Sequence, residues 1–496
     1  MDLPKYYRKL KSLHPLKKKT VLQAQTGKLI LIVIVAAGFA LGCSTEKNTV
    51  VTRSYHNLTA HYNVYFNGKL SLEEGKRDIE ENLDDDYASL LPVFKSSKEE
   101  AASMVSGKMD KAIKKSVKLI KTHSIKVPPK KPKYSLLEKF GLAGPPIQEK
   151  QEAFRERNEY CDWVDDAYLL MGKAHFFKHD FNGAVSSLKI LERNHKYTDL
   201  KTENFLWMAR AYSEMDNLES AKIYLDKASA REEGFDRKQR RLYHLVWADY
   251  FLKQQKYDQA VPQLDQAKGT FRLKRKKARY NYILAQIYQE QGNSDMAIAH
   301  FGKVIDQNPE YEMAFNAKIN RAVAYQGGST GEIIKEELLD MTTDEKNKDY
   351  LDRIYYALAQ MEKNAGNTQT AIEYFRKAAA YSNAASNQQA LIYLSLGDLY
   401  FLGREYQTSA AYYDSTMSVL SKDYPDYQQV YNKAIHLTQL AQHIQVVEHQ
   451  DSLQRVAEMP EAKRMALIED IIEEVKKREK EEEAKLKPGS GSSYSQ

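Results

Sequence analysis

The chain has 496 residues, more than one ordinary compact core accommodates. Glycine and proline are sparse, at 22 and 13 residues, tyrosine is abundant at 34, and strand-like alternation is nearly absent. This composition favours an extended helical array and argues against a protein built on β-sheets. Because only two cysteines are present, Cys43 and Cys161, a fold held together by disulfides is also excluded if Cys43 is modified.

Residues 1–42 are predicted to be a lipoprotein signal peptide. A basic N-terminus precedes the thirteen-residue apolar run Leu29–Leu41, which is shorter than the roughly 20 residues of a stable membrane span. The run ends in Ala40-Leu41-Gly42-Cys43, which resembles a bacterial lipobox. We therefore expect cleavage before Cys43 and a lipid on the new N-terminal cysteine, with a short uncleaved anchor as the alternative. No other cofactor is predicted.

The signal peptide also accounts for the net charge of +7. Eight Lys or Arg residues and one acid, Asp2, precede Cys43, so the processed chain carries 66 basic and 66 acidic side chains. The apparent basicity is therefore no evidence for nucleic acid as a partner. A basic N-terminus stays in the cytoplasm, so the body should be exported. Ser44, with no acidic run after it, favours the outer membrane and a periplasm-facing body.

Residues 43–125 are expected to form a separate helical region. An apolar pattern runs from Tyr62 to Ile79, and a second apolar stripe covers residues 98–122. Residues 126–150 then form a Pro/Lys-rich linker, which we expect to run extended as a spacer or surface loop. Cys161 follows the linker and is interpreted as a buried, inert thiol, because nothing in the sequence around it favours a thiolate.

Residues 151–458 repeat with a period of 37 to 39 residues. A small residue recurs where a first helix, helix A, would pack against a second, helix B. Twelve residues later a second small residue follows in most repeats, and four residues further a large apolar one, so both lie on one face of helix B. Two antiparallel helices approach to about 8–10 Å only where the contact residues are small. The first small residues are Gly172, Ala209, Ala248, Ala285, Ala322, Ala359 and Gly397.

This pattern is typical of the tetratricopeptide repeat (TPR), so the predicted fold is all-α, a superhelical solenoid of about seven to eight antiparallel helix pairs. Residues 43–125 are expected to hold a cryptic TPR-like pair as well. The fifth repeat departs from the pattern, because Gln326–Gly331 is rich in glycine and Ile334 stands where alanine is expected. Ala434 and Val446 continue the register, which suggests an eighth, capping-like pair.

The C-terminus changes character after residue 458. Residues 459–487 are predicted to form a charged helix, with an apolar stripe only in its first half, from Met465 to Val475. Residues 488–496 are dominated by glycine and serine and are expected to be disordered.

No catalytic motif emerges, so the protein is not expected to be an enzyme. Gly327–Gly331 lacks the lysine of a phosphate loop and follows a helix. His436, His443 and His449 are interpreted as ordinary surface or packing histidines, and no metal site is predicted. The basic run Arg272–Arg279 and the acidic run Glu80–Asp86 are each interpreted as solvated helix ends. An acidic partner or an anionic lipid headgroup is the alternative for the basic run.

The inner face of the A helices is where TPR arrays usually hold their partners. The position after the first small residue and the position three before it were chosen as contacts, because aromatic and arginine side chains commonly anchor such surfaces. The mixed charge indicates a protein-binding groove more than a clamp for one charged group. The predicted partner-binding residues are Arg210, Asp249, Tyr282, Gln286, Tyr356, Gln360 and Asp398.

Two stretches carry a sharper resemblance than the repeats do. The first covers Cys43–Thr49 and continues through Tyr55–Gly68, and the second covers Asp451–Arg455 with Met459–Glu461. Together with the repeats, they resemble the TPR lipoproteins of the type IX secretion and gliding-motility machinery of Bacteroidetes, the PorW/SprE type. Some members of that family are much longer, so the resemblance does not give a role for the short C-terminus.

The resemblance implies a non-enzymatic outer-membrane lipoprotein that faces the periplasm and is held by the lipid on Cys43. Its partners would be proteins of the secretion apparatus, the outer-membrane translocon and the periplasmic ring. Two alternatives stay open. One is a periplasmic TPR lipoprotein in outer-membrane protein assembly or envelope maintenance, and the other is a lipoprotein that binds glycans or peptidoglycan.

Overall fold

A computed structural model describes residues 44–130, 154–194, 199–382 and 387–486. All regular elements in these ranges are helices, and no strand occurs among them, so the predicted all-α class is confirmed. The predicted signal peptide, Cys43, most of the predicted linker and the C-terminal tail lie outside the described residues.

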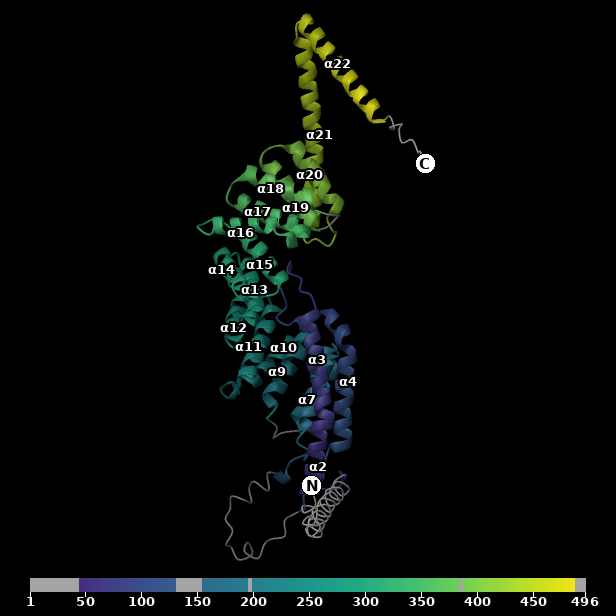
Figure 1. The fold of residues 1–496 in the computed structure, drawn as a ribbon, viewed down its shortest axis with the longest axis vertical. Helices are drawn as coiled ribbons and strands as arrows, with labels where there is room; N and C mark the ends of the chain where they lie inside the picture. Colours follow the sequence, from purple (N-terminus) through teal and green to yellow (C-terminus); the bar gives the residue numbers. More distant parts are fainter. Residues whose placement is uncertain (1–43, 131–153, 195–198, 383–386, 487–496) are drawn as a thin grey trace, which may run out of the picture. The chain divides into compact units, whose positions relative to one another are not determined.

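Seven antiparallel helix pairs follow one another in the described part of the chain after residue 163 (Figure 1). Each begins with a helix A and ends with a helix B, as the 37-residue period predicts. The pairs are α7 (Val164–Phe177) with α8 (Phe181–Asn194), α9 (Lys201–Glu214) with α10 (Leu218–Ser229), α11 (Arg237–Leu252) with α12 (Tyr257–Gly269), α13 (Lys274–Glu290) with α14 (Ser294–Ile305), α15 (Tyr311–Val323) with α16 (Gly331–Thr343), α17 (Leu351–Asn364) with α18 (Thr368–Tyr381), and α19 (Asn387–Leu402) with α20 (Tyr406–Val419).

Small residues hold the two helices of a pair together, as the sequence predicts. A side-chain carbon at Gly172 would lie 2.7 Å from Leu188, and one at Gly397 would lie 2.7 Å from the ring of Tyr413, so neither site has room for it. The corresponding alanines of the other pairs are fully buried, among them Ala209, Ala221 and Ala285. The predicted register of helix A on helix B is therefore confirmed.

The turn from helix A to helix B uses one residue in the left-handed region of backbone space. This residue is Gly292 in one pair and Gly366 in another, with φ of 70° and 83°. Side-chain-bearing residues take the same position elsewhere, with φ between 56° and 62°, namely His179, Asp216, Gln255 and Arg404. The next residue often caps helix B, as when the Asn293 side chain accepts from the Met296 amide.

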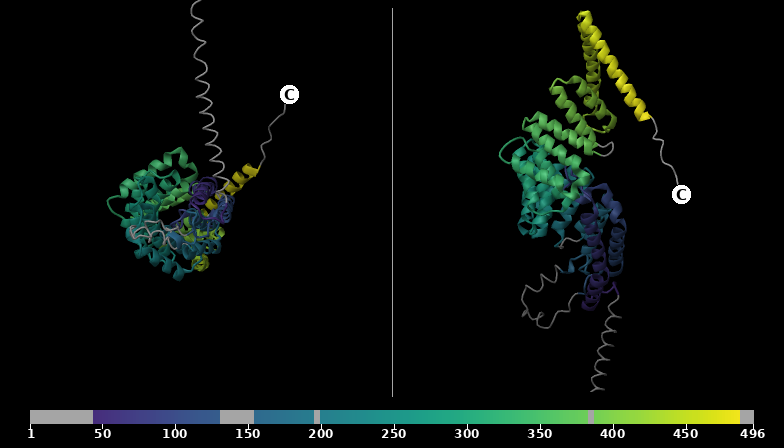
Figure 2. Two further views of the ribbon diagram at one scale, coloured as in Figure 1. Left: turned by 90° about the horizontal axis from the view of Figure 1, so that it is seen from below. Right: turned by 45° about the horizontal axis from the view of Figure 1, so that its top comes forward.

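The N-terminal region is one long helix packed against a shorter one. Helix α2 (Val50–Thr59) runs through the π-helical segment η1 (Ala60–Tyr65) into α3 (Phe66–Asn82), and α4 (Glu99–His123) packs beside it (Figures 1 and 2). Helix α4 in turn packs on α7, so this pair precedes the repeats and joins their first helix. Every fourth residue of the long helix is buried, in the series Thr52, His56, Ala60, Val64, Gly68 and Leu72.

The N-terminal residues that carry the family resemblance form a packed junction. The Asn48 side chain donates to the carbonyl of Val127 at 2.7 Å. The Asn57 amide nitrogen donates to the carboxylate of Asp162 at 2.7 Å, and the Asp162 amide donates back to the Asn57 oxygen at 2.9 Å. The ring of His61 stacks on Trp163 at 3.9 Å. These contacts fix the first helix to the residues that open the repeats.

The chain divides into two compact units, Met1–Ala317 and Lys318–Gln496. The division falls within α15, in the fifth repeat, whose sequence departs from the pattern of the others.

The prediction of an eighth helix pair is wrong. Ala434 and Val446 both lie on one continuous helix, α21 (Tyr427–Glu458), and Val446 is 59% exposed. The reason is local: no glycine or proline lies between Tyr427 and Met459, so nothing ends the helix until Pro460. Helix α22 (Glu461–Leu486) follows.

Candidate functional site

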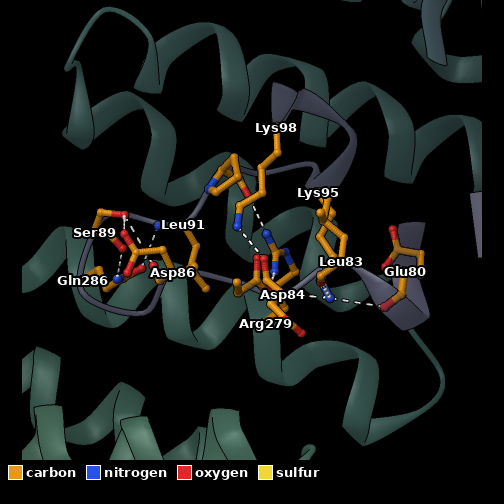
Figure 3. Close-up of polar contacts among 12 residues, drawn as sticks. Glu80, Leu83, Asp84, Asp86, Ser89, Leu91, Lys95, Lys98, Arg279 and Gln286 are labelled. Carbon is orange, nitrogen blue, oxygen red and sulfur yellow. Dashed lines mark hydrogen bonds and ion pairs between the residues drawn. The ribbon is translucent and has the colours of Figure 1, made fainter. Parts of the chain in front are cut away.

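The inner face of the first unit is covered by a segment of the chain itself. The connector between α3 and α4, Leu83–Lys98, lies across residues of α13 (Figure 3) and also contacts α9. It has sixteen residues, longer than most connections between helices. We call it the connector segment.

Gln286 holds the backbone of the connector segment at two points. Its side-chain oxygen accepts from the Leu91 amide at 3.0 Å, and its side-chain nitrogen donates to the Ser89 carbonyl at 2.6 Å (Figure 3). An amide group is suited to this role because it offers one donor and one acceptor side by side. Gln286 itself is 7% exposed, so both hydrogen bonds are shielded from water.

Arg279 anchors the first part of the connector segment through an ion pair and a hydrogen bond. Its guanidinium forms an ion pair with Asp85 and donates to the Pro92 carbonyl at 2.8 Å. The side chains of Asp85 and Arg279 are 1% and 11% exposed, so this ion pair is buried. Lys95 adds a second cation, 3.8 Å from the same carboxylate. The acidic and basic runs of the sequence therefore meet here, and their interpretation as solvated helix ends is wrong for Asp85 and Arg279.

Tyr282 packs one turn before Gln286. Its ring meets that of Tyr87 edge to face at 5.1 Å, and its hydroxyl donates to the Tyr87 carbonyl at 3.4 Å. Burial raises the pKa of Tyr87, and the nearby Asp85 carboxylate adds to the effect. The contact between these two tyrosines thus packs one end of the connector segment against α13.

Arg210 holds the other end of the connector segment. Its guanidinium lies 3.7 Å from the centre of the Phe94 ring and donates to the Ser96 hydroxyl at 3.2 Å. The rings of Phe176 and Trp207 lie on it at 4.4 and 4.7 Å, so the cation is enclosed by aromatic faces. Burial lowers the pKa of Arg210 to about 10.

Asp249 on α11 is also buried, and it makes no hydrogen bond with the described connector segment. Its carboxylate accepts from the Ser213 hydroxyl at 3.4 Å and lies 3.9 Å from the ammonium of Lys253. Burial raises the pKa of Asp249 to about 6.

The four predicted contacts of the first unit are therefore brought onto one face, but that face is occupied. Arg210, Tyr282 and Gln286 contact the connector segment, and Asp249 is buried and bonds Ser213. Their assignment as partner contacts stays a prediction, and it now requires a partner to displace the connector segment.

Sequence reasoning missed Arg279 as a contact, although two signals pointed to it. The runs Glu80–Asp86 and Arg272–Arg279 have opposite charge, and the first lies at the start of an unusually long connection between predicted helices. The sequence alone could not predict that the two runs pair, because 194 positions separate Asp85 from Arg279.

The three predicted contacts of the second unit form two groups. On α17, the Gln360 amide nitrogen donates to the hydroxyl of Tyr356 at 3.0 Å, and both side chains are half-buried. On α19, Asp398 accepts from the hydroxyl of Tyr413 at 2.5 Å and from the ammonium of Lys433 on α21 at 2.6 Å. Burial raises the pKa of Tyr356, and burial together with Asp398 raises that of Tyr413.

Tyr356 and Gln360 stand at the same repeat positions as Tyr282 and Gln286. In each case a tyrosine lies three residues before the small alanine of helix A and a glutamine directly after it. The glutamine of the first unit binds the backbone of the connector segment, whereas Gln360 bonds its own tyrosine. The same pair of residues thus binds a segment of the chain on α13, whereas on α17 its two side chains bond each other.

The described residues offer no arrangement for chemistry at a metal or thiol. Within the described ranges, no three His, Cys, Asp or Glu side chains are placed to hold a metal ion. Cys161 is buried as expected, and burial raises its pKa to about 12. None of the helices described is both long enough and apolar enough to cross a membrane.

Comparison with known proteins agrees with this architecture. Family models of the tetratricopeptide repeat match residues 202–233, 245–312 and 352–384, which cover the second half of α11 and almost all of α9, α10, α12 to α14, α17 and α18. Helix pairs and repeats together define the class of this protein: it is an all-helical array of tetratricopeptide repeats. No curated protein sequence matches the chain significantly.

Solved structures similar to the chain are distant. A tetratricopeptide repeat protein from Parabacteroides merdae is 15% identical with a TM-score of 0.35, covering 55% of this chain and 98% of its own. A Rap protein, solved with a competence and sporulation factor, is 15% identical with a TM-score of 0.32, covering 63% and 98%. A signal-transduction ATPase with a tetratricopeptide repeat sensor, from Pyrococcus horikoshii, is 16% identical with a TM-score of 0.35, covering 68% and 54%.

Proposed function

We propose that the protein is a non-enzymatic scaffold that binds an extended segment of a partner protein on α17, at Tyr356 and Gln360. The supporting observation is the filled counterpart on α13, where the same pair of residues holds an extended segment through its backbone. Because Gln286 reads one backbone amide and one carbonyl, it recognises an extended chain more than a particular side chain. Gln360 offers the same two groups.

Neighbouring residues would supply specificity. Asp398 and Lys433 place a carboxylate and an ammonium together on α19 and α21, each about 40% exposed. Such a pair can receive charged side chains of either sign at the edge of a bound segment. The partner segment would therefore pair its backbone with Gln360 and carry polar side chains.

We further propose that this scaffold is lipid-anchored at Cys43 in the outer membrane, faces the periplasm, and serves type IX secretion. The proposal rests on the lipobox-like Ala40–Cys43 and on the family resemblance of Cys43–Gly68. The partners would then be the translocon and the periplasmic ring. Only Ser44–Thr49 separate Cys43 from α2, so the anchor would hold the folded body close to the bilayer.

The test is affinity purification from cross-linked envelopes, followed by mass spectrometry, with the intact protein and two variants. Gln360→Ala removes the backbone-reading amide, and Gln369→Ala, at an exposed position on α18, is the matched control. The loss of hydrogen bonds that contribute roughly 1–3 kcal/mol corresponds to an affinity lower by about five- to a hundredfold or more. We expect translocon and ring subunits with the intact protein and with Gln369→Ala, and far less with Gln360→Ala.

Two results would contradict the proposal. Equal recovery with Gln360→Ala would show that α17 is not the binding face. Recovery of the barrel-assembly machinery, together with a general barrel defect on deletion, would favour the outer-membrane assembly alternative over secretion. The anchor has its own readout, since radiolabelled palmitate should enter the intact chain and fail to enter Cys43→Ala.

A further inference from the structure

An exposed apolar stripe runs along the first long helix. Val50, Leu58, Tyr62, Phe66 and Leu70 are 45–69% exposed, and they alternate with the buried series described above. Apart from Ser54, every fourth position from 50 to 70 is apolar and faces outward. We call these five residues the apolar stripe.

The π-helical segment keeps the apolar stripe on one face. A four-residue spacing in a plain α-helix turns by about 40° at each step, because one turn takes about 3.6 residues. A π-helix takes more residues per turn, so Ala60–Tyr65 turns the series back. The π-helical segment thus reduces the drift, and the buried and the exposed series both persist over about 30 Å of helix, at about 1.5 Å per residue.

Charge differs sharply between the two ends of this helix. Residues 44–72 hold three basic side chains, Lys47, Arg53 and Lys69, and one acid, Glu46. Residues 73–86 hold eight acids and only two basic residues, Lys76 and Arg77. In the sequence, the basic residues thus stand just before and within the span of the apolar stripe, and the acids begin where the stripe ends.

We propose that the apolar stripe lies on the surface of an anionic lipid bilayer. Helices that lie on membranes combine an apolar face with flanking Lys and Arg, and Tyr and Phe suit the headgroup boundary. The inference rests on the proposed anchor, since a lipid at Cys43, seven positions before Val50, would bring the stripe within roughly 25 Å of the bilayer at about 3.5 Å per residue. A basic segment next to an anionic surface is attracted to it.

The test uses the processed chain from residue 43 with Cys43→Ser, which keeps every described residue and carries no lipid. Its co-sedimentation is measured with vesicles of phosphatidylglycerol and phosphatidylethanolamine, and with phosphatidylcholine vesicles. We expect binding to the anionic vesicles that weakens with salt and falls at least tenfold in Leu58→Glu/Phe66→Glu. Ile223→Glu, at a 55% exposed position on α10, should bind like the parent chain.

A second measurement keeps the test valid if the double variant folds poorly. Tyr62→Cys is introduced into the same chain and labelled with an environment-sensitive dye, since Cys161 is buried. The dye emission should shift to the blue on anionic vesicles only. A stripe-dependent dimer that ignores vesicles, or vesicle binding that Leu58→Glu/Phe66→Glu leaves unchanged, would overturn the proposal. Because no lipidation and no partner are involved, these results are independent of the palmitate and purification tests.

Discussion

Single side chains decide what the first unit binds on its inner face. Gln286 and Arg279 hold the connector segment through two different kinds of contact. The Gln286 side chain bonds its backbone, and Arg279 forms a buried ion pair with it. The sequence predicted that Tyr282 and Gln286 share one face, because the repeat register fixes which residues lie on either side of the small alanine. It could not identify what covers them, because that depends on a packing contact between residues almost 200 positions apart.

Replacing Arg279 with methionine should destabilise the first unit by about 3–5 kcal/mol, because Asp85 is then left buried and without its strongest partner. Urea unfolding measures the change. Arg275→Met is the matched control in the same basic run, since Arg275 pairs with Glu310 on the surface, where both side chains are more than 60% exposed. It should change stability by less than about 1 kcal/mol. Equal effects of the two substitutions would contradict the buried ion pair.

His300 should make the stability of the first unit depend on pH. Burial lowers its pKa to about 4, and Lys303 and Lys268 act in the same direction against Asp265. The unfolded chain, with a pKa of about 6.5, therefore binds a proton that the folded chain does not, and stability is lost as pH falls from 6.5 towards 4.

Between pH 7 and pH 5 this loss amounts to about 2 kcal/mol. His300→Gln cannot titrate and can still bond Asn281, which lies 3.2 Å from the His300 ring nitrogen. Urea unfolding at both pH values should show the parent chain losing about 2 kcal/mol more than the variant. Identical pH dependence would mean that His300 is protonated or exposed in the folded state.

At the scale of elements, the repeat pattern predicted helix pairs because close approach demands small residues. The tight positions Gly172 and Gly397 are confirmed. The eighth pair was wrong because periodic positions continue in the sequence while every turn signal is missing. The connector segment was not predicted at all, because its irregular backbone is held by long-range contacts and has no period of its own.

Gly397→Ala should destabilise the second unit by about 1–3 kcal/mol, because the new methyl group meets the ring of Tyr413, which is held in place by Asp398. Gly107→Ala is the control, since no atom lies within 4 Å of a side-chain carbon at Gly107 on α4. There the gain in helix propensity should stabilise the protein by about 0.5–1 kcal/mol. Thermal unfolding monitored by circular dichroism compares the two. A stabilising Gly397→Ala would show that α19 and α20 are not packed this closely.

At the scale of the whole molecule, the sequence predicted the class of fold but not which face is available to a partner. In the first unit the connector segment covers Tyr282 and Gln286, and in the second unit the glutamine of the same pair bonds its own tyrosine. The anchor, the outer membrane and type IX secretion stay predictions, which rest on Cys43 and on the N-terminal resemblance. Composition and repeat spacing alone could not decide among the possible periplasmic roles.

Hydrogen–deuterium exchange on the Leu91 amide of the purified protein tests whether the connector segment covers the inner face of the first unit. The account predicts exchange at least tenfold slower than in an unstructured peptide, because this amide donates to Gln286 in a buried setting. Exchange at the rate of a free loop would contradict this claim.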